Sequence, residues 1–367
     1  MEVDDIALTM VPGLGVKGVA HLLSIFGDAR SVFMAGEDEL VGRAELRGTI
    51  AKDIAARISC RQAEKEIKYM ERNSLAAVAS TDPEYPHMLR ECPDYPHVLY
   101  VRGNVNALCG MRMISMVGTR KITPYGQRMC SILSGQLNEL EPDATVVSGL
   151  ACGVDAGCHK AAMEYGLKCV AVVANVLPEV TPAQNARLAD MIVAQGGAII
   201  SELNSQTKQN GSYYIPRNRI VAGISAGTVV VESPLEGGSL GTAEMAYGYD
   251  RVVMAVPGRA GDRCSEGSNM LIRNRKAVMV CSGGDIVYEL GWNIKRAGEI
   301  PARQVVAYPL DDDERRIVAC FGEGESVGLD ILAVRSGMSV GETSAVLMNL
   351  EINGVVRSLP GKVYELK

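Results

Sequence analysis

The sequence lacks the features that mark membrane, secreted and metal-binding proteins. No stretch approaches the roughly 20 apolar residues that span a bilayer, and the opening residues, MEVDDIALTM, are acidic where a signal peptide would be basic. The ten cysteines are scattered and form no C-x-x-C pair, so neither a zinc cluster nor a redox pair is predicted. We therefore expect free thiols in a cytoplasmic protein that does not enter a membrane.

Catalytic signatures are also scarce. There are only four histidines, and three of them, His21, His87 and His97, precede the predicted strands described below. The fourth, His159, falls on a helix. The sequence offers no obvious nucleophile with a base. Its few carboxylates near the predicted site are better suited to capping helices or to holding loops in place by hydrogen bonds. We predict no catalytic residue, no cofactor and no metal.

Six short apolar runs predict a parallel sheet. Because the runs are continuous rather than alternating, both faces of their strands should be buried. Thr123 followed by Pro124 marks the start of one intervening helix. The predicted fold class is α/β, with an extended Rossmann-type doubly wound sheet. The runs lie at residues 113–118, 144–149, 169–174, 198–202, 228–232 and 252–258.

A helical domain is predicted before this sheet. Residues 1–80 suggest short helices, with Gly13 and Gly15 in the turn of a helix-hairpin-helix (SAM-like) unit and Lys17 beside it. Such a turn can hold a phosphate on its amides, or can use glycine for its shape alone. Residues 81–299 are predicted to form the Rossmann domain, beginning with a proline-rich linking segment over residues 81–104.

The end of the chain predicts a winged helix. An acidic, proline-containing linker over 300–312 precedes residues 313–367, whose pattern is three helices and a hairpin. Ser339 and Glu342 are spaced as a capping box, and Gly354 suits a helix exit. The third helix has no basic residue between 340 and 350, whereas helices that read a DNA groove carry polar or basic ones. We expect this domain to meet a protein or to serve structure alone.

The candidate site lies in the loops at the carboxyl ends of the strands. The net charge is −6, but residues 102–290 hold 17 basic against 16 acidic side chains, and local charge governs phosphate binding. None of these loops carries G-x-G-x-x-G or G-x-x-x-x-G-K-[ST], which disfavours a dehydrogenase or an NTPase. Their small residues let amides at helix starts approach an anion. The predicted phosphate-binding residues are Gly118, Thr119, Arg120, Ser148, Gly149, Gly153, Arg217, Asn218, Arg219, Gly238, Ser239 and Thr242, with Lys121, Arg273, Arg275 and Lys276 as additional basic contacts.

Three arginines are central to this prediction. Arg120 directly follows a strand end, and Arg217 and Arg219 flank Asn218 where a loop enters a helix. Arginine suits the task because its planar donor fork fits phosphate oxygens. Side chains two positions apart at a helix start point in different directions, so one of this pair can bind phosphate while the other braces a loop carbonyl.

Several segments together resemble one protein family. They are DPEYPHMLRECPDYPHVLYVRGN, VGTRKITPYG, SGLACGVDAGCHKAA, IPRNRIVAGIS, GGSLGTAEMA, and VPG followed by GSNMLI. In this order they resemble the DprA (Smf) family of bacterial DNA-processing proteins, over nearly the whole chain. The sequence departs from the family pattern at TPAQN, where Thr181 and Ala183 replace a tyrosine and a basic residue, and at Lys276-Ala277, where Gly-Ala is usual.

The resemblance implies a binding protein rather than an enzyme. Family members bind single-stranded DNA with little sequence preference, protect incoming DNA, dimerise through the Rossmann domain, and load RecA in natural transformation or recombination. The arginine of the family's Gly-Ser-Arg loop corresponds to Arg120, with Thr119 in place of serine. Single-stranded DNA, RecA and a second copy of the chain are the expected partners.

Two other functions remain open from the sequence. Nucleotide phosphoribohydrolases with the motif P-G-G-x-G-T-x-x-E have a similar Rossmann variant, but here Met245 stands at the glutamate position and Glu244 lies one residue short. The other alternative is a sequence-reading regulator that acts through the winged helix.

Overall fold

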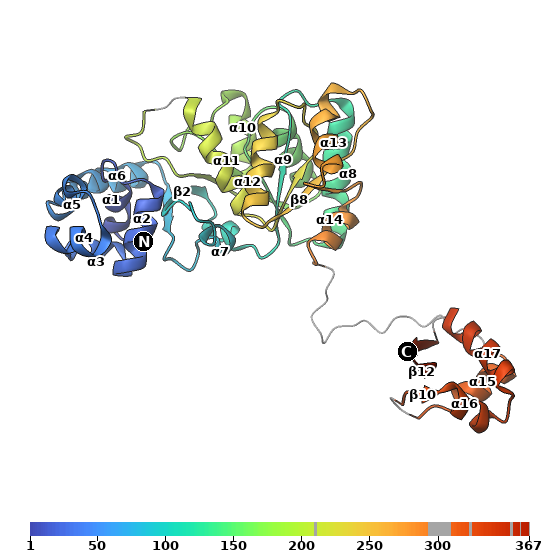
Figure 1. Ribbon diagram of the computed structural model, residues 1–367. Helices are drawn as coiled ribbons and strands as arrows, with labels where there is room; N and C mark the ends of the chain where they lie inside the picture. Colours follow the sequence, from blue (N-terminus) through green and yellow to red (C-terminus); the bar gives the residue numbers. More distant parts are fainter. Residues whose placement is uncertain (209–210, 293–309, 323–324, 353–354, 360, 367) are drawn as a thin grey trace. The chain divides into compact units, whose positions relative to one another are not determined.

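The computed structural model describes residues 1–208, 211–292, 310–322, 325–352, 355–359 and 361–366 (Figure 1). The chain divides into two compact units, Met1–Asn293 and Ile294–Lys367. The first unit holds the helical segment and the large sheet, and the second holds the winged helix.

The large sheet has nine strands among the described residues, in the order β1-β2-β6-β5-β4-β3-β7-β8-β9. All six predicted strands are present, and they run parallel from β6 to β8. From β3 the chain first winds outward to β6 and then returns to β7 on the other side, which places the topological switch at β3. The strands are β1 (Ala76–Ala79), β2 (Val98–Gly103), β3 (Met113–Val117), β4 (Thr145–Ser148), β5 (Lys168–Val172), β6 (Ala198–Ser201), β7 (Gly227–Val230), β8 (Val252–Ala255) and β9 (Val278–Met279).

Three strands were not predicted. β1 pairs antiparallel with β2, and β2 pairs antiparallel with β6, with Val101 opposite Ile200. The prediction that residues 81–104 are a linker was therefore wrong for β2, and residues 76–79 belong to the sheet rather than to the helical segment. Prolines and turn residues around Val98–Gly103 obscured a short apolar run that is buried by its neighbours. β9 has only two residues, too few for a periodic signal.

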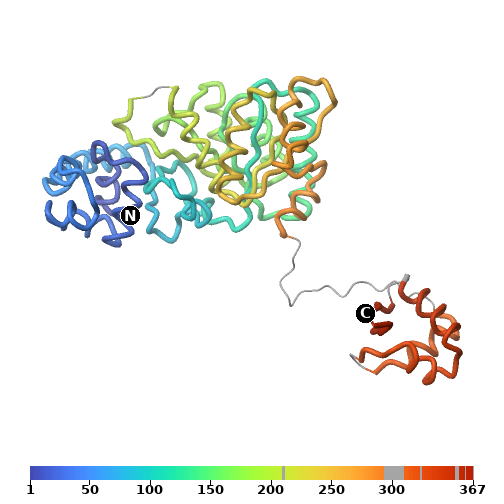
Figure 2. The backbone as a smooth tube through the Cα atoms, viewed as in Figure 1, coloured from blue at the N-terminus to red at the C-terminus, as the bar shows by residue number. Residues whose placement is uncertain are grey.

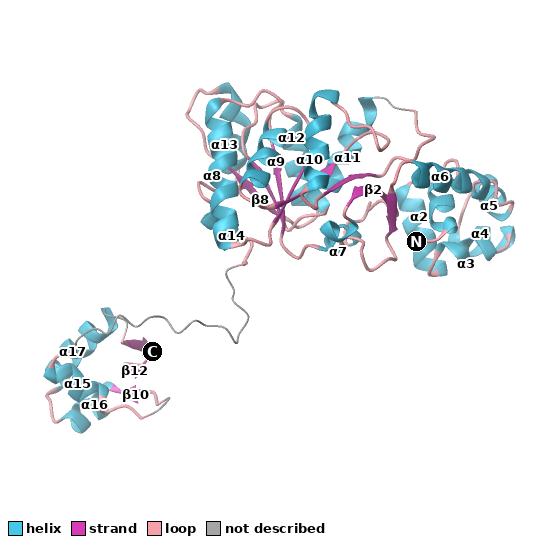
Figure 3. Cartoon of the chain, turned by 180° about the vertical axis from the view of Figure 1, so that it is seen from behind, coloured by secondary structure: helices cyan, strands magenta, loops and turns pink. Residues whose placement is uncertain are grey.

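Helices cover both faces of the sheet (Figure 3). Alternate residues of β3 point into opposite cores, Ile114 and Met116 into one, Met113 and Val117 into the other. The first core is closed by α8 (Pro124–Leu140), α9 (Val154–Glu164), α10 (Ala186–Ala194) and α14 (Gly283–Glu289). The second is closed by α7 (His87–Arg90), α11 (Tyr214–Gly223), α12 (Gly238–Gly248) and α13 (Glu266–Arg273). Each buried Leu, Ile or Met contributes roughly 1.5–3 kcal/mol, so these two cores hold the loops of the strand ends in place.

The start of α8 is as predicted. Thr123 caps it by accepting from the Gly126 amide at 3.2 Å, and Pro124 is its first residue. The backbone amide and hydroxyl of Thr123 both donate to the Glu232 carboxylate, at 3.0 and 2.5 Å. Thr123 therefore ties the first turn of α8 to the end of β7.

The N-terminal helices pack against β2 and the neighbouring loops, as the tube in Figure 2 also shows. They are α1 (Val3–Thr9), α2 (Val16–Phe26), α3 (Ala29–Met34), α4 (Glu37–Ala44), α5 (Gly48–Ala55) and α6 (Cys60–Arg72). The buried His97 ring lies 3.1 Å from Asp5 and 2.7 Å from the Ser80 hydroxyl. The Tyr69 hydroxyl donates to the Leu177 carbonyl at 2.7 Å. The predicted turn at residues 10–15 joins α1 to α2, and Lys17 is exposed.

The second unit has the predicted winged-helix order. Its elements are α15 (Asp312–Val318), β10 (Val327–Gly328), α16 (Leu329–Ser336), α17 (Val340–Ile352), β11 (Val356–Leu359) and β12 (Val363–Leu366). The capping box is present, since the Glu342 amide donates to Ser339 Oγ at 3.3 Å and the Ser339 amide donates to Glu342 at 2.9 Å. Gly354 and residues 300–309 of the predicted linker lie outside the described residues.

Candidate nucleic-acid interface

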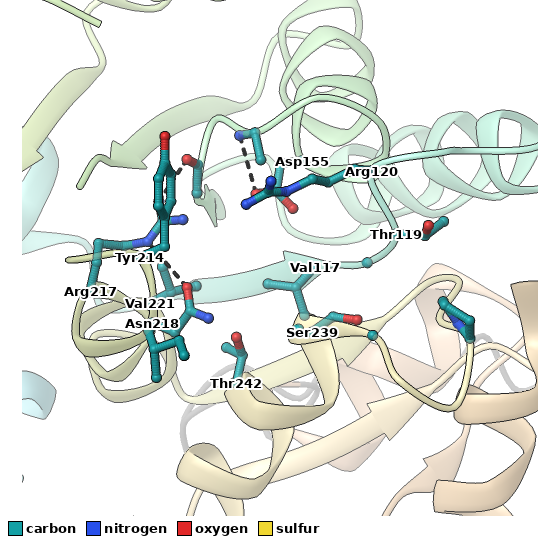
Figure 4. A pocket seen from close by; sticks show the side chains of 17 residues that line it. Val117, Thr119, Arg120, Asp155, Tyr214, Arg217, Asn218, Val221, Ser239 and Thr242 are labelled. Atoms are coloured by element: carbon teal, nitrogen blue, oxygen red, sulfur yellow. Dashed lines mark hydrogen bonds between the residues drawn. The ribbon is translucent and has the colours of Figure 1, made fainter. Parts of the chain in front are cut away.

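A cavity of about 320 Å³ lies at the switch point, where the ends of β3 and β7 meet the loop after β4 (Figure 4). In doubly wound sheets this is the expected place for a ligand. The cavity is lined by Val117, Gly118, Thr119, Arg120, Gly149, Ala151, Asp155, Tyr214, Ile215, Arg217, Asn218, Val221, Pro234, Gly237, Gly238, Ser239 and Thr242.

The loop after β3 is fixed by close backbone packing. The Thr119 amide donates to the Glu232 carbonyl at 2.7 Å, and its carbonyl accepts from the Val154 amide at 3.0 Å. A Cβ on Gly118 would lie 2.6 Å from both the Glu232 carbonyl oxygen and the Val154 side chain. Glycine is therefore required there, and the loop that carries Arg120 is held on both sides.

Arg120 is an exposed arginine at the edge of this cavity. Its guanidinium lies over the Tyr214 ring, 5.3 Å from the ring centre, and no ion pair to it occurs within the described part of the chain. The ring orients the side chain and leaves its donors free for an anion. Tyr214 was not among the predicted residues, because its contact with Arg120 joins segments far apart in the sequence.

Arg217 lines the cavity but is buried, with 6% of its surface exposed. Its Nη1 donates to the Gly149 carbonyl at 2.6 Å and to the Val172 carbonyl, and its Nε donates to Asn218 Oδ1 at 3.2 Å. A Cβ on Gly149 would lie 2.6 Å from the guanidinium, so glycine is needed for this approach. Much of the donor capacity of Arg217 is thus used to brace the loops after β4 and β5.

Asp155 faces Arg217 across the wall of the cavity. Burial raises the pKa of Asp155 and lowers the pKa of Arg217, and the attraction between their charges opposes both shifts. Asp155 also accepts from the Ala151 amide at 3.3 Å, which ties it to its own loop. These two charges offset each other, so Arg120 supplies the remaining positive charge of the cavity.

Arg219 does not reach the cavity. Its guanidinium makes two hydrogen bonds to the Glu202 carboxylate, at 2.7 and 2.6 Å, and its Nε donates to the Asp94 carbonyl at 2.9 Å. Only 8% of its surface is exposed. Arg219 is therefore withdrawn from the predicted phosphate contacts, because its donors are satisfied inside the protein.

The start of α12 forms the opposite wall of the cavity (Figure 4). Its N-cap, Gly237, provides no side-chain cap, and the Leu240 amide donates to the Gly237 carbonyl at 3.0 Å. The uncapped helix start, with its Gly238 and Ser239 amides, suits an anion. Ser239 donates to the Ser233 hydroxyl at 2.9 Å, and Thr242 faces the cavity one turn later. Gly238 has open space where a side chain would be. Three of the predicted residues, Gly238, Ser239 and Thr242, are thus brought together here.

Two of the residues predicted to contact phosphate do not line the cavity. Ser148 is fully buried and donates to the Met116 carbonyl at 2.6 Å. Gly153 has φ +83°, and a Cβ there would lie 2.2 Å from the Thr119 carbonyl oxygen. Ser148 is too buried to contact a ligand directly, and Gly153 positions the loop that carries Arg120.

The additional basic residues lie outside the cavity lining. Lys276 forms an exposed ion pair with Glu244 at 2.9 Å. Arg273 and Arg275 are exposed at the end of α13, and Lys121 is exposed in the loop after β3. None of the four lines the cavity that contains Arg120.

The described residues lack groups suited to metal binding or membrane insertion. There, no three His, Cys, Asp or Glu side chains gather in a way that could hold a metal ion. Nor does that part of the chain contain a helix with the length and hydropathy needed to cross a bilayer. His159 is fully buried, which lowers its pKa to about 4 and keeps its ring neutral.

Comparison with known proteins gives a consistent family. The family model of DNA recombination-mediator protein A matches residues 76–291, and that of the DprA winged helix domain matches residues 301–362. Protein Smf of Escherichia coli (strain K12) is 32% identical over 315 residues, which are 83% of this chain and 81% of that protein. The DNA processing protein DprA of Streptococcus pneumoniae is 35% identical over 209 residues, 57% of this chain and 72% of that protein.

Solved structures agree with this comparison. The X-ray structure of DNA processing protein A from Streptococcus pneumoniae matches with a TM-score of 0.68 and 27% identity, over 79% of this chain and 98% of that one. A structure of DNA processing protein A from Helicobacter pylori, described for its unique single-stranded DNA binding mode, matches with a TM-score of 0.52 over 59% of this chain and 96% of that one. At 24% identity, the second likeness shows the fold alone.

Proposed function

The chain belongs to the family of DNA recombination-mediator protein A, and we propose that it binds single-stranded DNA phosphates in the cavity between β3 and α12. The observation that carries the proposal is Arg120, which is exposed, oriented by Tyr214, and unpaired within the described residues. An arginine held in this way beside the open start of a helix favours a phosphate.

The cavity suits a single strand better than a duplex. At about 320 Å³ it is at the small end of ligand sites and has room for part of a nucleotide chain, not for paired strands. Its lining holds Arg120, the Asn218 side chain and the loops at helix starts, whose donors suit phosphate oxygens. Binding through phosphates carries little sequence information, so affinity should be nearly independent of sequence.

An apolar edge of the cavity provides a place for sugar and base. Ile215, which lines the cavity, is 72% exposed, and the neighbouring Tyr214 is half-buried and lies under the Arg120 guanidinium. Stacking or apolar contact with bases is tolerant of sequence and adds to phosphate binding in single-strand sites.

As a member of this family, the protein is proposed to load RecA onto the bound strand and to protect DNA during transformation or recombination in the cytoplasm. A homodimer through the Rossmann domain fits the exposed edge of its sheet. Val278 and Met279 of the edge strand β9 are 42% and 54% exposed, and Tyr247 is 59% exposed. Unpaired strand edges and apolar surface favour pairing with a second copy.

Two alternatives receive less support. For a phosphoribohydrolase, Glu244 would have to act in the cavity, but it lies outside the lining and pairs with Lys276. For a winged-helix regulator, α17 would have to face DNA phosphates, yet residues 340–350 contain no basic side chain. Release of free base from nucleoside monophosphates would revive the first alternative.

The test is a salt titration with single- and double-stranded oligonucleotides of the same sequence. The expected result is tighter binding to the single strand, with log affinity falling linearly as log salt rises. A second single strand of scrambled sequence should bind equally well. Equal affinity for single and double strands would contradict the proposal.

A further inference from the structure

A second, larger cavity of about 870 Å³ lies beside the first. It is lined by Thr123, Pro124, Tyr125, Arg128, Glu232, Pro257, Gly258, Arg259, Asp262, Arg263, Cys264 and Ser265. None of the phosphate-binding residues predicted from the sequence lines this cavity, and the proposed function does not use it.

The two cavities share their walls. Residues 117–120, at the end of β3 and the start of the β3–α8 connection, line the first cavity. Residues 123–125, at the end of that connection and the start of α8, line the second. The β7–α12 connection does the same, with Glu232 in the second cavity and Pro234 in the first. A DNA strand that leaves the first cavity across either of these loops therefore enters the second cavity.

The far wall of the second cavity is built rigidly. The Tyr125 hydroxyl donates to the Pro257 carbonyl at 2.5 Å, which fixes the loop after β8 against α8. The Gly258 amide donates to Asn269 Oδ1 at 3.0 Å, and Asn269 Nδ2 donates back to the Gly258 carbonyl at 3.1 Å. The Gly267 amide donates to the Ser233 carbonyl at 2.8 Å. The loop that carries Arg259 and Arg263 is therefore anchored at both ends.

The charges of this cavity favour an anion. Arg128, Arg259 and Arg263 are all exposed, and no ion pair to any of them occurs in the described ranges. Of the two carboxylates in the lining, Glu232 is 1% exposed and accepts from Thr123, whereas Asp262 is exposed. Three arginines with free donors outnumber these two acids, and one of the acids is already satisfied inside the wall.

We propose that the second cavity is an extension of the DNA site, in which Arg128, Arg259 and Arg263 hold phosphates of the same strand that Arg120 holds. The inference rests on the proposed function. It adds that affinity depends on strand length, because only a strand long enough to cross the shared loops reaches these arginines. Single-strand sites commonly combine such a basic track with a few fixed contacts.

The experiment compares a short and a long single strand, of about 4 and about 20 nucleotides, on the unchanged full-length protein and on three variants of it. The test variant carries Arg128→Gln, Arg259→Gln and Arg263→Gln. The control carries Arg61→Gln, Lys65→Gln and Lys68→Gln, which remove the same charge from exposed positions on α6. A third variant carries Arg128→Lys, Arg259→Lys and Arg263→Lys, which retain the charge.

The test variant should bind the long strand roughly 10- to 100-fold more weakly, with a salt slope smaller by about 2, from about 0.7 for each of three contacts. Its binding to the short strand should stay within about twofold of the unchanged protein. The lysine form should keep the salt slope and the control should resemble the unchanged protein, which separates a lost contact from misfolding and from general charge effects.

Two results would overturn the extension while leaving the first cavity in place. One is an unchanged affinity of the test variant for the long strand. The other is an equal loss for both strand lengths, which would place the arginines at the first contact. If the unchanged protein binds neither strand, the proposed function and its extension fail together.

Discussion

Arg120 and the two arginines of α11 have similar sequence settings but opposite surroundings. Arg120 is exposed and its guanidinium lies over an aromatic ring, whereas Arg217 and Arg219 are 6% and 8% exposed and donate to carbonyls and a carboxylate of the protein itself. A buried guanidinium must satisfy its donors internally, since an unpaired buried charge is costly. Arg217 and Arg219 therefore brace loops inside the protein, and Arg120 is the arginine that we propose to bind the phosphate.

Among substitutions that test this contrast between buried and exposed arginines, the largest effect is expected on the stability of the protein when Arg219 is replaced. Arg219→Ala should lower the free energy of unfolding by about 3 kcal/mol, because it leaves the Glu202 carboxylate partly buried without its partner. Urea unfolding measures the change, with Arg61→Ala as the control for an exposed arginine. A loss in DNA affinity with unaltered stability would mean that Arg219 contacts the ligand after all.

A smaller effect is expected at Gly149, which lets Arg217 approach its carbonyl partners. Gly149→Ala places a Cβ 2.6 Å from the guanidinium, and we expect a loss of about 1–3 kcal/mol in stability together with weaker DNA binding. Gly241→Ala is the matched control, since no atom lies within 4 Å of its Cβ position in α12. Equal behaviour of the two variants would show that Arg217 does not need this close approach.

The smallest effect is expected on DNA affinity when the winged helix is removed, because we assign DNA binding to the unit that contains the large sheet. Removal of residues 311–367 should change the affinity for a single strand by no more than about twofold, because phosphate affinity follows basic contacts and α17 offers none between 340 and 350. The measurement is a binding titration of the shortened chain at fixed salt. Abolished binding would transfer the DNA site to the winged helix.

The sequence predicted most of the fold because its signals there are local. A continuous apolar run such as residues 169–174 predicts a strand buried on both faces even when its neighbours are unknown. Thr123-Pro124 likewise starts a helix through contacts within one turn. β2 was missed because its burial comes from pairing with β6, about a hundred residues later. Prolines on one side of it dominated the local pattern.

The lining of the cavity was predicted in outline and not in detail, for the same reason, and its role as a DNA site stays a prediction. The glycine-rich loops and Arg120 do line one cavity. The roles of Arg217 and Arg219, however, depend on carbonyls at Gly149 and Asp94, which lie far away in the sequence. Only the folded structure shows which arginines have their N–H donors hydrogen-bonded within the protein.

The central claim is that Arg120 holds a phosphate of single-stranded DNA. The most direct test is the salt dependence of binding for Arg120→Ala, beside Arg61→Ala as the matched exposed control. The account predicts about fivefold weaker binding at 0.1 M salt and a slope smaller by about 0.7, for strands of every sequence, with stability unchanged. Affinity and slope equal to those of the control would contradict it.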